Sequence, residues 1–289
     1  MTIQQAYLQL LQQLSTLYDN RESGNIADLV IEKITALRKI DRIVYKDTII
    51  SPEEQNLLSK ITSELLQHKP VQYAIGEAWF MGMKLLVNEQ VLIPRPETEE
   101  LANWIIQDIK TNKKKEVSVL DIGTGSGCIP MSIKQLLPYT YVTAIDISEG
   151  ALQVAKINSV NLNVLIDFLL LDILDENTWK QLGHFDIIVS NPPYIRNSEG
   201  LTMRKNVMDY EPHLALFVED NDPLLFYKKI ATFAKTHLQQ TGKIYVEINE
   251  EFAQEVISIF QQNSFFNIEL RKDMQGKDRM VCAKRNESD

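Results

Sequence analysis

The hydrophobic positions of residues 1–70 recur at the spacing of α-helices. Two stripes are formed, one by Tyr7, Leu10, Leu11, Leu14, Leu17 and Tyr18 and one by Ala27, Val30, Ile31, Ile34 and Leu37. A third helix is predicted to begin at Ser51, with Pro52 in its first position and Glu54 completing a capping box, and to end at Lys69-Pro70. Narrow stripes on short helices predict a small bundle in which these residues pack a core.

The period of the pattern changes to about two between residues 71 and 93. Alternating residues, then the polar residues 88–90 and the apolar Val91–Ile93, predict a β-hairpin with its turn at 88–90. Pro94 then favours a rigid extended link before a helix that runs from about Pro96 to Ile109. The link is interpreted as the joint between two domains and as a wall of an active site, and the alternative is a plain Pro-rich linker.

From Val117 onwards, strand-like apolar runs alternate with helical patterns. The predicted strands are 117–121, 141–146, 166–171, 185–189 and 243–248, with two more near 267–271 and 279–283. This alternation predicts a parallel sheet with helices on both faces, and the short connection between the last two strands predicts an antiparallel hairpin. A long loop is expected at about 195–222, followed by a helix from Pro223 to about Leu238 that Gly242 stops.

Composition and charge restrict the possible functions. The 289 residues, 44% hydrophobic and 24% charged, are typical of a soluble chain with one large and one small domain. The N-terminus lacks signal-peptide features, so Cys128 and Cys282 are expected to be reduced thiols in the cytoplasm. The histidines show no metal-ligand spacing, and no metal is expected.

The net charge of −9 argues against duplex DNA as the main partner, although a local basic patch could exist. The acidic charge suits a basic protein partner.

A glycine-rich turn, Asp121–Gly127, follows the predicted strand 117–121. Glycines let the backbone approach a ligand, and the free N–H groups at the start of the next helix attract an anion. The spacing is G-x-G-x-G and no Lys-Ser/Thr follows, which weakens dinucleotide and P-loop interpretations and favours a smaller anion, such as the carboxylate of a methionine moiety. The candidate binding residues are Gly123, Thr124, Gly125, Ser126 and Gly127.

Acidic residues end the next two predicted strands. Asp146 is placed to bind a ribose diol, although it could instead cap the following helix, a role for which Ser148 competes. Asp172 could accept a hydrogen bond from the exocyclic amine of adenine while Ile173 packs on the ring, or it could be a solvated strand end. The turn and both acidic residues, at three consecutive strand ends, together predict S-adenosylmethionine (SAM) at the carboxyl edge of the sheet.

The segment Ser190–Tyr194, with the sequence Ser-Asn-Pro-Pro-Tyr, follows the predicted strand 185–189. Its prolines have no N–H to donate, which leaves the Asn191 side-chain amide, the backbone carbonyls and the Tyr194 ring. These groups suit a planar NH2 group that donates hydrogen bonds and stacks. The alternative is a strand that simply ends in a Pro-rich turn.

With these features, further segments make the chain resemble the HemK/PrmC family, the peptide chain release factor glutamine N5-methyltransferases, which are class I methyltransferases. The segments are Pro70–Gly76, Leu92–Glu99, Asn191–Ile195, Tyr210–Pro212 with Ala215–Leu216, and Asp273 with Gly276–Arg279. The resemblance implies a Rossmann-like, seven-stranded, mostly parallel sheet with an antiparallel last strand, plus an N-terminal helical bundle. It implies a helical substrate-binding domain over 1–73, a hairpin and linker over 74–96, and a SAM-dependent methyltransferase domain over 97–289.

The resemblance further implies methyl transfer from SAM to a glutamine side-chain amide of a release factor, in the cytoplasm, with S-adenosyl-L-homocysteine as product. Asn191 Oδ1 and the Pro192 carbonyl would accept the two amide hydrogens and Tyr194 would pack on the amide, which makes these three the catalytic candidates. Pro193 would join them in binding substrate, and Asn191 would also contact the cofactor. The alternatives are an adenine N6-methyltransferase acting on nucleic acid, a glutamine methyltransferase of a ribosomal protein, and a noncatalytic SAM-binding module. The first should carry a basic face, whereas residues 1–93 carry nine basic and eleven acidic side chains.

Overall fold

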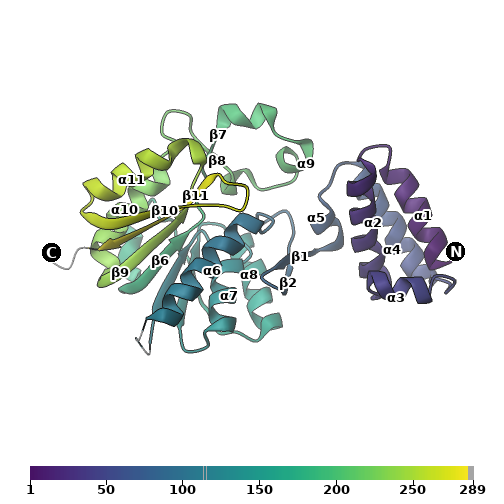
Figure 1. Cartoon of the computed structure of the whole chain (residues 1–289), viewed down its shortest axis with the longest axis horizontal. Coiled ribbons are helices and arrows are strands. Elements are labelled where there is room, and N and C mark those ends of the chain that lie inside the picture. The colour runs from purple at the N-terminus through teal and green to yellow at the C-terminus, as the bar shows by residue number, and fades with distance from the viewer. Residues whose placement is uncertain (113, 115, 286–289) are drawn as a thin grey trace. The chain divides into compact units, whose positions relative to one another are not determined.

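The computed structural model describes residues 1–112, 114 and 116–285. The chain divides into two compact units, shown with their elements in Figure 1. One unit contains Met1–Glu77 and Arg204–Tyr210, and the other contains Ala78–Met203 and Glu211–Asp289. The short return segment 204–210 therefore groups with the N-terminal residues, and the division at residues 73 and 96 stays a prediction.

The N-terminal unit is a helical bundle. Its helices are α1 (Ile3–Leu14), α2 (Asn20–Thr35), α3 (Lys39–Val44), α4 (Pro52–Leu66) and α5 (Val71–Ile75), with α9 (Lys205–Met208) from the return segment. The capping box at Ser51 is confirmed, since Ser51 Oγ accepts from the Glu54 N–H and Glu54 accepts from the Ser51 N–H. Most residues of the two stripes pack with α4 around a buried core. Leu17 is 40% exposed, so the core role predicted for it is wrong. Tyr210 Oη donates to the Gln67 carbonyl at 2.8 Å. Helices α3 and α5 are too short to give a periodic signal.

The predicted hairpin has its turn in another place. Strands β1 (Glu77–Phe80) and β2 (Met83–Leu86) form a two-stranded sheet, and the chain reverses at Met81-Gly82. Both turn residues have positive φ, 47° and 78°, a conformation that Gly82 adopts without strain. The predicted turn at 88–90 is present, but it does not close the hairpin, and Val91–Ile93 is not a strand. Asn88 Oδ1 does accept from the Gln90 N–H, so the polar signal marks a local turn after β2.

The second unit is built on a sheet that, within the described residues, has seven strands. They are β3 (Ser118–Ile122), β4 (Tyr141–Asp146), β5 (Asp167–Leu170), β6 (Phe185–Ser190), β9 (Leu238–Glu247), β10 (Phe265–Lys272) and β11 (Asp278–Arg285). Their order is β10-β11-β9-β6-β3-β4-β5. The last strand, β11, runs antiparallel to both neighbours, and the remaining neighbours pair in parallel. The predicted fold class is therefore confirmed.

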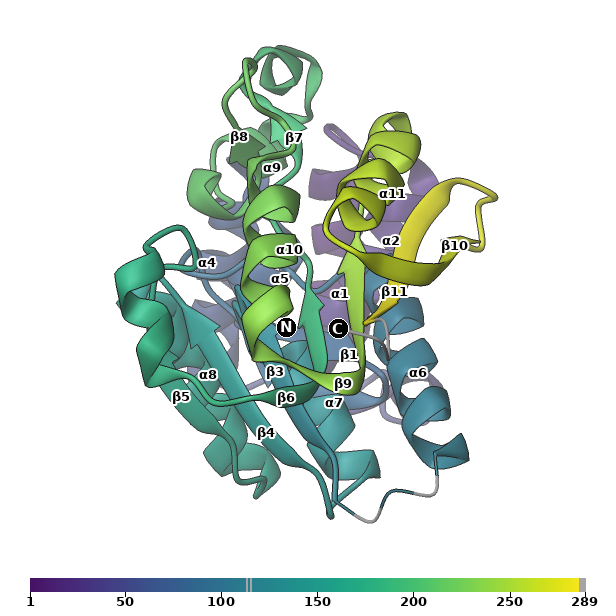
Figure 2. The ribbon, with the colours of Figure 1, turned by 90° about the vertical axis from the view of Figure 1, so that its left-hand side faces the viewer.

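Helices cover both faces of this sheet (Figure 2). On one face lie α6 (Pro96–Thr111), α7 (Cys128–Leu136) and α8 (Glu149–Leu162), and on the other α10 (Leu225–His237) and α11 (Ala253–Gln262). Each layer has its own apolar core, because successive residues of a strand point to opposite faces. Cys128 and Cys282 are buried free thiols in the α6–α8 layer.

Two connections differ from the prediction. The expected loop 195–222 contains β7 (Ile195–Arg196) and β8 (Phe217–Val218), which pair in parallel, and the short helices η2 (Asn197–Thr202), α9 and η3 (His213–Ala215). Elements this short leave no periodic pattern. Gly242 does not stop the preceding helix, because α10 ends at His237 and β9 begins at the next residue and runs through Gly242.

Candidate active site

A cavity of about 190 Å³ opens at the carboxyl ends of β3, β4, β5 and β6. Most of its lining comes from the segments that follow these strands, and Pro94, Arg95, Pro212, Leu214 and Phe226 contribute as well. Strand β3 has β4 on one side and β6 on the other, so the chain order of the sheet reverses here. Open α/β sheets bind ligands at such a switch point.

The glycine-rich turn forms one wall of the cavity. Gly123, Gly125 and Gly127 have φ values of 74°, 53° and 79°, which side chains strongly disfavour. Gly127 also caps α7, and a Cβ added there would lie 2.4 Å from Met131 Cε. The turn thus depends on glycine both for its backbone conformation and for its packing on α7.

Asp146, the last residue of β4, holds this turn in place. Its Oδ2 accepts from the Gly125 N–H at 2.8 Å and its Oδ1 from the Ser148 N–H at 2.9 Å. The cap of α8 is Ser148, whose Oγ accepts from the Ala151 N–H, so the capping alternative for Asp146 is excluded. Burial raises the pKa of Asp146, and the backbone hydrogen bonds oppose that rise. The carboxylate faces the cavity with spare lone pairs on both oxygens.

Asp172, the acidic residue predicted to end the strand after β4, lies just beyond that strand. Strand β5 ends at Leu170, and Asp172 and Ile173 follow it and line the cavity. Asp172 Oδ1 accepts from the Leu174 N–H at 2.8 Å, which orients the side chain. Ile173 is 6% exposed and supplies an apolar surface beside the carboxylate. An acceptor beside an apolar wall suits a heterocyclic base with an exocyclic amine.

The Asn-Pro-Pro segment lines the same cavity directly after β6. Asn191 Nδ2 donates to Thr98 Oγ1 at 3.1 Å. Tyr194 is not among the lining residues of the described part of the chain. Its hydroxyl donates to Glu247 Oε1 at 3.1 Å, and its ring packs against the core under α10 and α11. The structure thus brings Asn191, Pro192 and Pro193 to the residues predicted to bind the cofactor, and a direct substrate contact for Tyr194 stays a prediction.

Comparisons with known proteins agree with this arrangement. Residues 5–76 match the family model described as PrmC N-terminal domain, and residues 99–209 match the one described as Methyltransferase small domain. The release factor glutamine methyltransferase of Flavobacterium psychrophilum is 42% identical over 97% of this chain and 98% of its own length. That of Bacteroides thetaiotaomicron is 39% identical over 95% and 97%. The chain belongs to the release factor glutamine methyltransferase family.

Membership of this family confirms the resemblance inferred from the sequence and makes the chain a methyltransferase. Among solved structures, the fold is similar to the rRNA methyltransferase RsmC of T. thermophilus in complex with AdoMet and guanosine. The identity is 13%, the TM-score is 0.52, and the match covers 73% of this chain and 50% of that chain. Within the described residues, helices long and apolar enough to cross a membrane are absent.

Sequence reasoning missed polar residues that support the site of this family member. Thr98 and Glu247 are both buried and link Asn191 to Tyr194. Glu247 ends β9, just as Asp146 ends β4. An acidic residue at the end of a predicted strand could therefore have identified Glu247 as a candidate from the sequence. Arg95 Nη2 donates to Glu211 Oε1 at 2.6 Å, joining two of the segments that carried the resemblance. Burial raises the pKa of Glu211, and Arg95 opposes that rise.

Proposed function

We propose that this protein transfers a methyl group from SAM to the side-chain amide nitrogen (N5) of a glutamine in class I peptide chain release factors. The observation that carries the proposal is the presence of Asn191, Pro192 and Pro193 in the same cavity as the glycine turn, Asp146 and Asp172. The curated relatives named release factor glutamine methyltransferase span nearly the full length of this chain, which supports the choice of substrate.

The residues present fit SAM as the methyl donor. Asp121, which lies in β3 one residue before its end, is 1% exposed, and neither of its carboxylate oxygens has a hydrogen-bond partner among the described residues. Buried acceptors without donors are costly, so a cationic group brought by a ligand would be favoured nearby. The turn N–H groups of Gly123, Thr124, Gly125 and Gly127 already donate within the protein, so the N–H groups at the start of α7 would face the methionine carboxylate. Asp146 would face the ribose diol, and Asp172 with Ile173 the adenine. Bound SAM supplies a methyl group on a sulfonium, and its transfer leaves S-adenosyl-L-homocysteine.

The chain's own contribution to the reaction is to orient and polarise an amide. An amide nitrogen is a weak nucleophile because its lone pair is delocalised into the carbonyl. Asn191 Oδ1 and the Pro192 carbonyl would accept its two hydrogens, which holds the nitrogen in position and stabilises the positive charge that develops on it. The cavity as a whole is lined mostly by apolar surface, which strengthens hydrogen bonds made inside it.

Nucleic acid adenine is the main rival substrate, because its amino group is also planar. The net charge of −9 disfavours it, since a nucleic-acid enzyme needs cations to neutralise phosphates. A glutamine of a ribosomal protein is the second rival, and the acidic charge does not separate it from a release factor.

Mass spectrometry decides among these substrates. Class I release factors, a ribosomal-protein mixture and duplex DNA are incubated separately with the protein and SAM. We expect one added methyl on a single glutamine of a release factor, and its loss in Asn191→Ala. Methyl transfer to DNA or only to a ribosomal protein would overturn the proposal.

A further inference from the structure

A chain of buried hydrogen bonds runs from Tyr194 through Glu247 and Thr98 to Asn191. Tyr194 Oη donates to Glu247 Oε1 at 3.1 Å, and Thr98 Oγ1 donates to Glu247 Oε2 at 2.7 Å. Asn191 Nδ2 donates to Thr98 Oγ1 at 3.1 Å. Glu247 is 1% and Thr98 3% exposed, so water does not replace these partners.

The chemistry of these groups gives the chain a single direction. Glu247 in its ionised form, which the Thr98 and Tyr194 hydroxyls and Arg279 favour, only accepts hydrogen bonds, so the one hydrogen of the Thr98 hydroxyl is used by Glu247. The Thr98 oxygen is then left as an acceptor and requires an N–H from Asn191. The Asn191 amide must therefore present Nδ2 to Thr98 and Oδ1 on its other side. A flipped amide would place two oxygens against each other, or leave the buried carboxylate without a donor.

Glu247 is itself held firmly at the end of β9. Tyr227 Oη donates to its backbone carbonyl, and Arg279 Nη1 donates to the carbonyl of Ile248. Arg279 is in turn fixed by Asp273, whose Oδ2 accepts from Arg279 Nε at 3.2 Å. Burial raises the pKa of Glu247, while the hydroxyls of Thr98 and Tyr194 and the positive charge of Arg279 oppose that rise.

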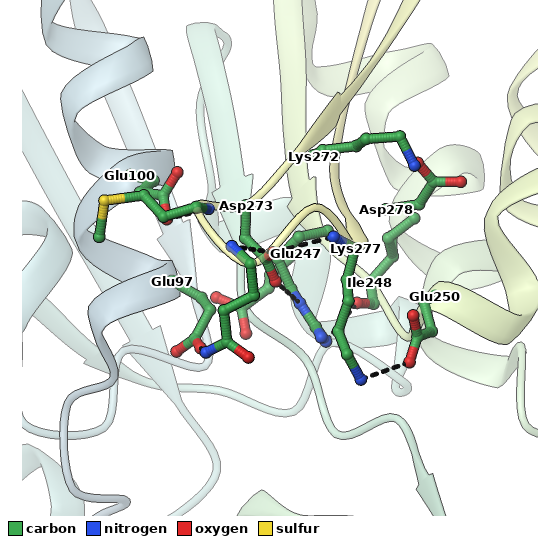
Figure 3. A network of polar contacts seen from close by, with 12 residues as sticks. Glu97, Glu100, Glu247, Ile248, Glu250, Lys272, Asp273, Lys277 and Asp278 are labelled. Atoms are coloured by element: carbon green, nitrogen blue, oxygen red, sulfur yellow. Dashed lines mark hydrogen bonds and ion pairs between the residues drawn. The ribbon is translucent and has the colours of Figure 1, made fainter.

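The loop between β10 and β11 ties this strand end to the start of α6, as Figure 3 shows. Asp273 Oδ1 accepts from the N–H groups of Gln275 and Lys277, which shapes the loop. The same loop contacts α6 on both sides of Thr98: Gln275 Nε2 donates to Glu97 and the Met274 N–H donates to Glu100. Thr98 and Glu247 come from distant parts of the chain, and the loop contacts the elements that carry both of them.

We propose that Thr98 and Glu247 are positioning residues that fix the Asn191 side-chain amide with Oδ1 directed to the substrate. Thr98 also lines the cavity, and we infer that both residues act on the reaction through Asn191. The inference rests on the proposed function, because it names what makes Asn191 an acceptor and not a donor toward the glutamine NH2. A donor in that place would meet the substrate's own hydrogens and prevent binding in the reactive orientation.

The test compares Thr98→Val, which keeps the shape and removes the hydroxyl, with Thr98→Ser, which keeps the hydroxyl. For methylation of a release factor we expect kcat to fall about 10- to 100-fold in Thr98→Val and to stay within about threefold in Thr98→Ser. The dissociation constant for SAM, measured by calorimetry, should be unchanged in both. Should Thr98→Val fold poorly by its Tm, Thr98→Ala is expected to show the same loss of kcat.

A second measurement separates this inference from the choice of substrate. In ¹H–¹⁵N spectra of the uncomplexed protein, one Asn191 side-chain N–H should be protected from exchange in the wild type and Thr98→Ser, and unprotected in Thr98→Val. Equal kcat in Thr98→Val and wild type, an equal loss in Thr98→Ser, or no change in protection would overturn the positioning role. A wild type that leaves release factors unmethylated while the protection pattern holds would overturn only the proposed function.

Discussion

Asp146 Oδ2 accepts a hydrogen bond from the backbone N–H of Gly125 at 2.8 Å. The end of β4 thereby fixes the glycine turn that follows the neighbouring strand β3, and the residue expected to bind the ribose also shapes the turn expected to bind the methionine moiety. Cofactor affinity and local stability should therefore respond together to changes at Asp146.

Asp146→Ala removes both the proposed diol acceptor and the anchor of the turn. We expect the dissociation constant for SAM to rise about 30-fold or more, corresponding to a loss of about 2 kcal/mol for a charged hydrogen bond, with a modest fall in Tm. Calorimetric titration and thermal unfolding measure the two effects. Asp167→Ala is the matched control, since Asp167 is exposed at the opposite end of β5 and should bind SAM as the wild type does. Unchanged affinity in Asp146→Ala would show that the ribose binds elsewhere.

Gly127→Ala tests how far the turn depends on glycine. The new Cβ combines a positive φ with a 2.4 Å approach to Met131 Cε, so we expect a loss of about 2 to 4 kcal/mol of unfolding free energy in urea. Gly276→Ala provides the comparison, because Gly276 has φ +85° but nothing within 4 Å of the added atom, and only the backbone strain of about 1 kcal/mol applies. Equal losses in the two variants would mean that the contact with Met131 relaxes without cost.

Much of the sheet could be predicted from local pattern, because each strand is a short apolar run between polar residues. The strand Tyr141–Asp146 matches its prediction to the residue, and the position of Asp146 at its end follows from it. The hairpin turn at Met81-Gly82 could not be predicted, because Met-Gly carries none of the Asn or Asp signals that mark such turns. Thr98 and Glu247 are 149 residues apart, and only the folded sheet brings them together.

Asp121 predicts a specific pH dependence. Burial raises its pKa from 3.8 to about 7, so between these values the unfolded chain releases a proton that the folded protein retains. The stability contributed by the protonated carboxyl is complete below about pH 4 and is lost as the pH rises through 7. The side chain of Asp121→Asn cannot ionise. The stability of this variant relative to wild type should therefore increase by a few kcal/mol from pH 4 to pH 8. Urea titrations at a series of pH values measure this difference, and a constant difference would contradict the raised pKa.

The Arg95–Glu211 ion pair joins two segments that line the cavity, so a substitution of Arg95 should lower the stability of the protein through Glu211. Glu211 is 3% exposed, whereas the Arg95 side chain is 34% exposed, so the carboxylate depends on its partner more than the guanidinium does. In Arg95→Met that charge stays buried and keeps a long 3.4 Å hydrogen bond from the Ile93 N–H. We expect a loss of about 2 to 3 kcal/mol in urea unfolding, somewhat below the cost for fully buried pairs because Arg95 is partly solvated.

The double variant Arg95→Met/Glu211→Gln should regain more than half of that loss, since a neutral amide is much cheaper to bury than an unpaired carboxylate. Lys277→Met breaks the pair with Glu250, whose side chains are 47% and 42% exposed, and should cost less than about 1 kcal/mol. A double variant no more stable than Arg95→Met would show that Arg95 stabilises the fold through the packing of its side chain and not through the charge of Glu211.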